Sequence, residues 1–521
     1  MSFARNIATV GIATLMSRLL GFVRDMLIAA LFGAGVRADA FFVAFQVANL
    51  VRRLLAEGAL NAALVPLYLQ ARDRGGDVAA GAFVGRLVGT ALVGLTVAAG
   101  FCALAMSWIV PVLAPGFQAG GPRTALAIDL ARLMLPYLVF AGPLAVLIGV
   151  LNANRRFTFA AFTTAAFNVV VLGALAVVMF GGVAEGNTPA RVLAFAVGAA
   201  GLAQLALVVV AISFGDARVT PIRVSLGPDI RRFVTLAVPG LIANGIPQIT
   251  IIAGVMVASS SRSAVSWLYY ANRLVELPLG IVGIAVGTVL VPTLTHALRG
   301  GDHADGEAAE SRGLELALGL ALPAALGLAV LAQPIVHVLF ERGAFTAADT
   351  AATAAALSAF AFGLPGHILV KTFSPVFFAR EDTTTPMRAT LAGLAVAVIL
   401  SLALFPLWRH VGVAVAIALS GWTTAAMLAA QIVRRIGFRI DGAARRRLPR
   451  IVIAACGMGL VIELAWMRVA PWLAVIGAGE TAYAVALLLL VVLGLASYGL
   501  LLWLFGVAEL RHLLAPRRRT P

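Results

Sequence analysis

Charged side chains are scarce in this sequence. Asp, Glu, Lys and Arg make up 12% of its 521 residues, whereas soluble domains contain roughly 25%. Hydrophobic residues make up 61%, and the mean hydropathy is +0.99. These values exclude an ordinary soluble domain and indicate a polytopic membrane protein.

Cysteine, histidine and lysine are also rare. Cys102 and Cys456 are the only cysteines and lie in apolar runs, so they provide neither a disulfide framework nor the spacing of a metal site. The six histidines are scattered, and we expect no bound metal. Lys371 is the only lysine. The net charge of +16 is therefore mostly arginine, and because most arginines flank apolar spans, membrane topology explains them better than a nucleic-acid partner does.

The apolar runs predict an all-α fold with about fourteen membrane-spanning helices. Their expected ranges are 5–32, 38–70, 79–113, 124–151, 158–181, 188–214, 229–258, 264–298, 311–340, 348–378, 384–408, 411–435, 449–470 and 479–506. An even number of spans puts both termini on one side. The loops on that side hold many more arginines than the opposite loops, so the positive-inside rule predicts both termini in the cytoplasm.

A weak internal repeat relates two halves of the chain at an offset of about 226 residues. Val65-Pro66 matches Val291-Pro292, and each pair precedes a short basic segment. The apolar residues at 109–113 match those at 335–339, and each set precedes a Gly-containing loop that ends in Phe. Six spans per repeat predict two lobes of the same orientation with a site between them.

The repeat sets the expected domain boundaries. The lobes are expected at 1–214 and 229–436. The last two spans, within 449–506, fall outside the repeat and follow an arginine-rich linker at 434–450. Those arginines are explained by topology or by contact with anionic lipid heads.

A polar stripe runs through the second expected span. It contains Asp39, Gln46, Asn49, Arg52, Arg53 and Glu57. Spacings of three and four residues place several of these side chains on one helix face. Charged groups at membrane depth cost at least about 3 kcal/mol each unless they face a cavity or a partner. A local Arg53–Glu57 salt bridge is the alternative, but one glutamate cannot satisfy two adjacent arginines, which favours a water-filled chamber.

Two further spans carry charge. The first span contains Arg18, Arg24 and Asp25, and the eighth contains Ser266, Asn272, Arg273 and Glu276. One aspartate beside two arginines leaves an excess positive charge. Arg273 and Glu276 are i,i+3 neighbours, so a self-contained ion pair explains them as well as a chamber does.

The arginines at 18, 24, 52, 53 and 273 predict a cationic chamber. Arginine binds phosphate oxygens through two parallel hydrogen bonds, which indicates an anionic, phosphorylated substrate. The sequence has no Walker A pattern and no soluble domain to hold ATP. We therefore expect a transporter rather than an enzyme, without cofactor, driven by an ion gradient, the membrane potential or the substrate gradient.

At these residues the sequence resembles the MurJ/MviN family of lipid II flippases, within the multidrug/oligosaccharidyl-lipid/polysaccharide exporter superfamily. The resembling motifs are SRLLGFVRD at 17–25, FGAGVRADAFFVAFQVANLVRRLLAEGALNAALVP at 32–66, SWLYYANRLVELPLGIVGIAVGT at 266–288 and FAREDTTTP at 378–386. The first two motifs are long and specific, and the resemblance spans nearly the whole chain.

The resemblance implies two six-helix lobes around a central cavity, plus two C-terminal helices that form a lipid-tail groove. It implies alternating access that moves the undecaprenyl-pyrophosphate-linked peptidoglycan precursor, lipid II, outward across the bacterial cytoplasmic membrane for cell-wall synthesis. Expected partners are lipid II, membrane lipids and the cell-wall synthesis machinery. Expected substrate-binding residues are Arg18, Arg24, Asp25, Asp39, Asn49, Arg52, Arg53, Glu57, Ser266, Arg273 and Glu276.

The sequence departs from the family pattern at two positions. Asn272 stands where members often have Asp, and Gln46 stands where some have Lys. A role that needs charge at either position is therefore in doubt, and no sodium site is identified.

Three other functions remain open. A drug or cation antiporter, or another lipid-linked polysaccharide flippase, would belong to the same superfamily. A cation exporter should line its cavity with carboxylates and aromatic rings, which the arginine excess disfavours. A scaffold without transport leaves the buried charge unexplained.

Overall fold

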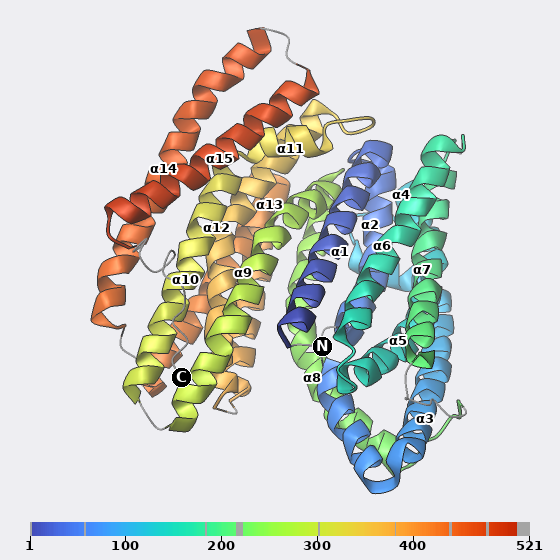
Figure 1. Cartoon of the computed structure of the whole chain (residues 1–521). Helices are drawn as coiled ribbons and strands as arrows, with labels where there is room; N and C mark the ends of the chain where they lie inside the picture. The colour runs from blue at the N-terminus through green and yellow to red at the C-terminus, as the bar shows by residue number, and fades with distance from the viewer. Residues whose placement is uncertain are drawn as a thin grey trace. The chain divides into compact units, whose positions relative to one another are not determined.

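The structure, a computed structural model, is helical throughout the part of the chain that it describes (Figure 1). It describes residues 3–56, 59–182, 185–214, 222–300, 303–380, 382–436, 440–475 and 479–507. The helices of the first half are α1 (Phe3–Phe32), α2 (Val36–Ala56), α3 (Ala59–Leu113), α4 (Pro122–Met134), α5 (Pro136–Ala153), α6 (Phe157–Phe180) and α7 (Thr188–Ser213). Those of the second half are α8 (Pro228–Ala258), α9 (Ala264–Gly300), α10 (His303–Val330), α11 (Ala332–Phe340), α12 (Ala347–Phe378), α13 (Thr384–Gln431), the π-helix η1 (Ile432–Ile436), α14 (Gly442–Val475) and α15 (Glu480–Leu504).

Two of the longest helices are broken by residues with non-helical backbone angles. In α3 the break falls at Gly75 and Gly76, where Gly76 has a φ of 67° that only glycine adopts without strain. In α13 it falls at Arg409, with a φ of 50°. The second break separates the expected spans 384–408 and 411–435, so α13 is two spans joined by a kink rather than a turn.

The expected all-α membrane fold is confirmed. Nine helical stretches among the described residues are long and apolar enough to cross a membrane. Two of them, 63–113 and 384–435, are the kinked helices. The first holds the expected span 79–113 and the end of 38–70, and the second holds two expected spans. The more polar helices α1, α2, α8 and α9 cover the remaining expected spans.

Three expected spans differ from the helices observed. The expected span 38–70 is not one helix, because α2 ends at Ala56 and α3 begins at Ala59. The expected span 124–151 is broken between α4 and α5 at Pro136, which has no backbone N–H to continue the helical bonding. The expected span 311–340 is likewise divided, at Leu331.

The helix order of the second half follows that of the first. Helices α1, α4 and α6 begin at residues 3, 122 and 157, and α8, α12 and α13 begin at residues 228, 347 and 384. Each pair of starts is separated by about 226 residues, the offset of the sequence repeat.

The chain forms two compact units. The first comprises residues 1–266 with 342–345, and the second comprises 267–341 with 346–521. The first unit therefore reaches past residue 214, and the lobe boundaries expected from the repeat stay a prediction.

An extended segment, residues 222–227, holds α8 in the first unit. Thr90 on α3 donates its hydroxyl to the Ser225 carbonyl at 3.0 Å and accepts the Ser225 N–H at 3.1 Å. Arg86 on α3 pairs with Asp229 at the start of α8 at 3.1 Å. Within the first unit α3 packs on α5 and on α8, α1 packs on α6, and α2 packs on α4.

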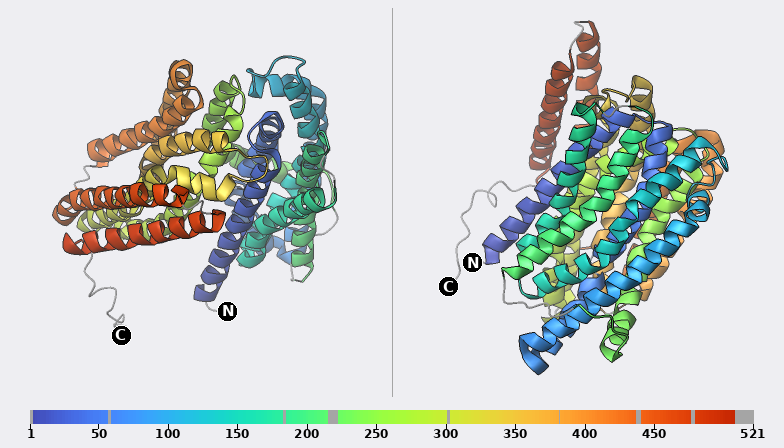
Figure 2. Two further views of the ribbon diagram at one scale, coloured as in Figure 1. Left: turned by 90° about the horizontal axis from the view of Figure 1, so that it is seen from above. Right: turned by 90° about the vertical axis from the view of Figure 1, so that its right-hand side faces the viewer.

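The second unit is built on α12. It packs against α10, α11 and α13, and α14 packs on both α10 and α15. The capping box of Thr346 and Asp349 fixes the start of α12, because each side chain accepts the other residue's backbone N–H. Both views in Figure 2 show α14 and α15 side by side.

Candidate functional site

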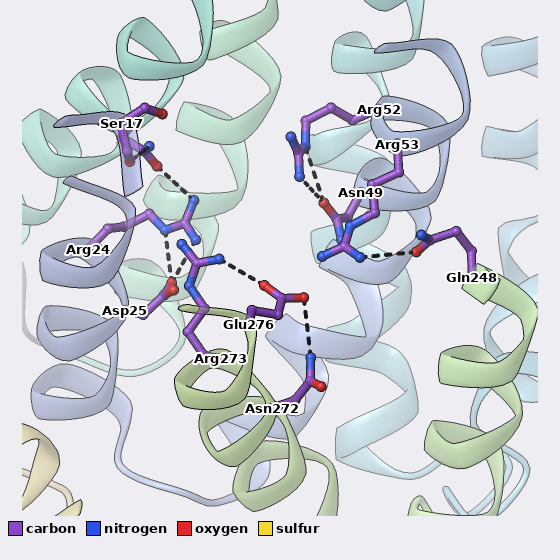
Figure 3. A network of polar contacts seen from close by, with 11 residues as sticks. Ser17, Arg24, Asp25, Asn49, Arg52, Arg53, Gln248, Asn272, Arg273 and Glu276 are labelled. Carbon is purple, nitrogen blue, oxygen red and sulfur yellow. Dashed lines mark hydrogen bonds and ion pairs between the residues drawn. The ribbon is translucent and has the colours of Figure 1, made fainter. Parts of the chain in front are cut away.

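Arg24 lies in the middle of α1 and is almost fully buried, with 7% of its surface exposed. Its Nε and Nη2 atoms donate to Asp25 Oδ1 at 3.0 and 2.7 Å, so the expected local neutralisation by Asp25 is observed. Its Nη1 atom donates to Asn168 Oδ1 on α6 at 3.1 Å, and the Asn168 amide donates in turn to the Ser17 carbonyl at 2.9 Å (Figure 3). Three hydrogen bonds to two partners therefore fix the guanidinium.

Arg52 and Arg53 on α2 donate hydrogen bonds to different residues. Arg52 donates from Nε and Nη2 to Asn49 Oδ1, one helical turn earlier, at 3.2 and 2.7 Å. Arg53 donates from Nη1 to Gln248 Oε1 on α8 at 3.4 Å (Figure 3). Asn49 and Gln248 are neutral side chains, and their oxygens orient the two guanidinium groups.

Asp39, at the start of α2, is fully buried. Its Oδ1 accepts the Ser266 hydroxyl at 2.6 Å and the Ser266 N–H at 3.1 Å, and its Oδ2 accepts the Ser263 N–H at 2.9 Å. Oδ2 also pairs with Arg123 on α4 at 2.5 Å. Two expected site residues, Asp39 and Ser266, thus meet in a junction of α2, α4 and α9.

In the second unit Glu276 accepts from two neighbours on α9. Arg273 donates to Glu276 Oε2 at 3.0 Å, and Asn272 donates to Oε1 at 3.3 Å (Figure 3). The i,i+3 ion pair considered from the sequence is therefore present. The departure to Asn at 272 has a physical reason here, because an aspartate would set a like charge beside Glu276.

The remaining expected site residues are Arg18 and Glu57. Arg18 is half-buried on α1, one turn before Phe22. Glu57 lies outside the described residues, so the alternative of an Arg53–Glu57 salt bridge is not tested.

Four residues of these junctions were missed by sequence reasoning: Arg123, Asn168, Gln248 and Ser263. Asn168 and Gln248 are polar residues within apolar runs, and this is the one signal in the sequence that could have identified them. Among the described residues, no three His, Cys, Asp or Glu side chains gather as a metal site would require.

The FAREDTTTP motif forms a turn before α13. Asp382 accepts the backbone N–H groups of Thr384 and Thr385 at 3.0 and 2.9 Å and the Thr385 hydroxyl at 2.6 Å. The Thr385 hydroxyl and backbone hydrogen bonds lower the pKa of Asp382 below its ordinary value. This motif residue therefore caps a helix start, where carboxylates are favoured.

An apolar groove of about 560 Å³ lies between α14 and α15. Ala465, Val469, Trp472 and Leu473 line it from α14, and Thr481, Ala482, Val485, Ala486, Leu489, Leu490 and Leu493 line it from α15. Thr481 and the indole N–H of Trp472 are the only polar side-chain groups among these lining residues, so the groove suits a hydrocarbon rather than a head group.

Comparisons with known proteins agree with this geometry. A family model described as "Lipid II flippase MurJ" matches residues 28–478. The "Probable lipid II flippase MurJ" of Rhizobium meliloti is 41% identical over 481 residues, 91% of this chain and 88% of its own length. That of Rhizobium tropici is 36% identical over 527 residues, 100% of this chain and 98% of its own.

A solved structure shares the fold. The structure of "Lipid II flippase MurJ, inward closed conformation" has a TM-score of 0.77 and 23% identity, and the match covers 97% of this chain and 99% of that one. The motifs, the helix order and the family match agree, and the chain belongs to the MurJ family of lipid II flippases.

Proposed function

We propose that this chain is a flippase that moves lipid II from the inner to the outer leaflet of the bacterial cytoplasmic membrane by alternating access. The observation that carries the proposal is the match of the family model to residues 28–478, a range that includes the arginine-bearing helix α2. The guanidinium groups of Arg52 and Arg53 are of the kind that forms charge-assisted hydrogen bonds to phosphate oxygens.

The charge of the substrate explains why arginines are needed. A bare diphosphate is too costly to move through a medium of low dielectric constant. Guanidinium groups replace its hydration shell with charge-assisted hydrogen bonds. In this proposal Arg18, Arg24, Arg52 and Arg53 bind the pyrophosphate, with Arg273 as a further ligand.

The polar side chains near the arginines suit the sugar-peptide head group. Asn49 and Gln46 offer amide groups of the kind that hydrogen-bond to sugars and peptides, whereas the expected contribution of Ser266 is not available because its fully buried hydroxyl donates to Asp39. Asp25 and Glu276 belong to the proposed site as partners that orient Arg24 and Arg273. Asp39 and Glu57 are proposed as further residues of the site.

The groove between α14 and α15 supports a site for the isoprenoid tail. Its lining is almost entirely apolar and its volume is about 560 Å³. A tail held there stays in a hydrocarbon environment while the head group crosses, so that no apolar surface is transferred into water.

The arginine asymmetry of the loops supports an orientation with both termini in the cytoplasm. In that orientation the membrane potential or an ion gradient drives transport, because the chain carries no nucleotide-binding motif. The cell-wall synthesis machinery would receive the product.

Native mass spectrometry of the purified protein with lipid II tests the proposal. We expect a lipid II adduct that is weakened in Arg52→Ala and in Arg273→Ala. The matched control is Arg191→Ala, because Arg191 is 58% exposed and paired with Asp129 away from these clusters. Equal binding of an uncharged polyprenol, or equal weakening in the control, would refute the proposal.

A further inference from the structure

Arg24 lies over two aromatic rings as well as beside its hydrogen-bond partners. Its guanidinium carbon is 5.7 Å from the centroid of the Phe45 ring on α2 and 5.7 Å from that of Phe167 on α6. The two centroids are 6.4 Å apart. The cation and the two rings therefore form a nearly equilateral triangle that joins α1, α2 and α6.

Both rings are held in place by further contacts. Phe45 stacks on Phe41, with centroids 6.1 Å apart and planes at 8°. Phe167 meets Tyr137 edge-on at 5.8 Å, and the Tyr137 hydroxyl donates to Gln204 Oε1 at 3.2 Å. The two rings are 8% and 5% exposed. Neither ring has room to turn away from Arg24 without moving a second buried side chain.

The rings and the hydrogen bonds act on Arg24 in different ways. Hydrogen bonds to Asp25 and Asn168 lie along the N–H directions of the guanidinium and fix its rotation in its own plane. An aromatic face attracts a cation through its quadrupole and carries no net charge. Rings therefore stabilise the buried cation without the neutralisation that a second carboxylate would bring.

We propose that Phe45 and Phe167 are positioning residues that hold the Arg24 guanidinium pre-oriented for the pyrophosphate of the substrate. The proposal rests on the proposed function, because it takes Arg24 as a ligand of that pyrophosphate. A pre-oriented guanidinium binds more tightly, since less conformational freedom is lost when the ligand arrives.

Fluorination of Phe167 tests the proposal with little change of shape. Phenylalanine at 167 is replaced by its mono-, di- and trifluorinated forms, which weaken the quadrupole of the ring step by step. We expect the affinity for lipid II, measured by native mass spectrometry, to fall stepwise by roughly three- to tenfold in total. The same series at Phe83, a buried ring in the apolar core around α3, controls for the hydrophobicity of fluorine and should leave affinity unchanged.

A second readout needs no substrate. Thermal unfolding of the fluorinated series is measured in the wild-type background and in Arg24→Gln/Asp25→Asn, which removes both charges together. We expect fluorination to lower the Tm only when Arg24 is present. An equal Tm change in both backgrounds shows that the rings do not act on the cation and overturns the proposal.

The outcomes separate this proposal from the proposed function. If the wild-type protein binds lipid II but the affinity is the same across the Phe167 series, the rings do not position Arg24 and the proposal fails. If the wild-type protein binds no lipid II, the proposed function fails, and the claim that the rings position Arg24 for that ligand falls with it.

Phe167→Trp, which keeps an aromatic face, should retain more affinity for lipid II than Phe167→Leu.

Discussion

The Oδ1 atom of Asp39 accepts both the hydroxyl and the backbone N–H of Ser266, at 2.6 and 3.1 Å. Ser266 lies in the first turn of α9, which begins at Ala264. The first N–H groups of a helix have no partner within it, and a carboxylate there is favoured by the helix dipole. Asp39 on α2 therefore caps a helix that lies 227 residues away in sequence.

Removing the Asp39 carboxylate should destabilise the protein. Asp39→Ala leaves the first turn of α9 uncapped and Arg123 without its buried partner, and we expect a loss of about 3 kcal/mol. Thermal unfolding in detergent measures it. The control, Asp129→Ala, removes the partner of Arg191 at the surface and should cost less than about 1 kcal/mol. Similar Tm values for the two variants would contradict the capping role.

Gly116 should tolerate no side chain. A Cβ atom added there would lie 2.2 Å from the Ser260 Cα, because the Gly116 N–H donates to Ser259 Oγ at 2.9 Å and brings the two backbones together. We expect Gly116→Ala to lower stability by about 1–3 kcal/mol, measured as a fall in Tm. Gly35→Ala is the control, since nothing lies within 4 Å of its added Cβ. An unchanged Tm in Gly116→Ala would show that this loop does not pack closely on α8.

The charge of the arginines should matter more for transport than for folding. Arg52→Ala, and the double variant Arg24→Gln/Asp25→Asn that removes both charges of the buried pair together, should each abolish complementation of a strain depleted of its own flippase, with near-normal abundance in the membrane. Arg191→Ala should complement normally. Immunoblotting of membranes measures abundance, and loss of the Arg52→Ala protein itself would assign a structural role to that side chain.

Both termini should lie in the cytoplasm. The loops on the side of the termini hold most of the arginines. A reporter that fluoresces only in the cytoplasm, fused to Pro521, should therefore be bright. A stable fusion that does not fluoresce would place the C-terminus outside the cytoplasm and contradict the prediction.

The groove between α14 and α15 should recognise the length of the lipid tail. Val485→Trp places a large side chain in the groove and should weaken the binding of lipid II with a full-length tail more than that of a short-tailed analogue. The control is Val492→Trp, which is similarly exposed on α15 but does not line the groove. If Val485→Trp weakens the binding of the full-length lipid and of the short-tailed analogue equally, the groove is not a site for the tail.

The local sequence predicted the spans and the contacts between neighbours. Apolar runs long enough to cross a bilayer fix where helices form, and the break at Arg409 falls between two expected spans. The pair Arg273–Glu276 was visible as well, because side chains three or four residues apart on a helix are neighbours whatever the tertiary packing is.

The partners that complete each cluster were decided by tertiary structure alone. Asn168 lies 144 residues from Arg24, and Gln248 lies 195 residues from Arg53. No periodicity relates such residues, since their approach depends on which faces of α1, α2, α6 and α8 pack together. The sequence by itself determined that this chain crosses a membrane with unusual positive charge on its helices. Packing decided which neutral amides and aromatic rings hold that charge, because a buried polar group must find its hydrogen bonds wherever the fold supplies them.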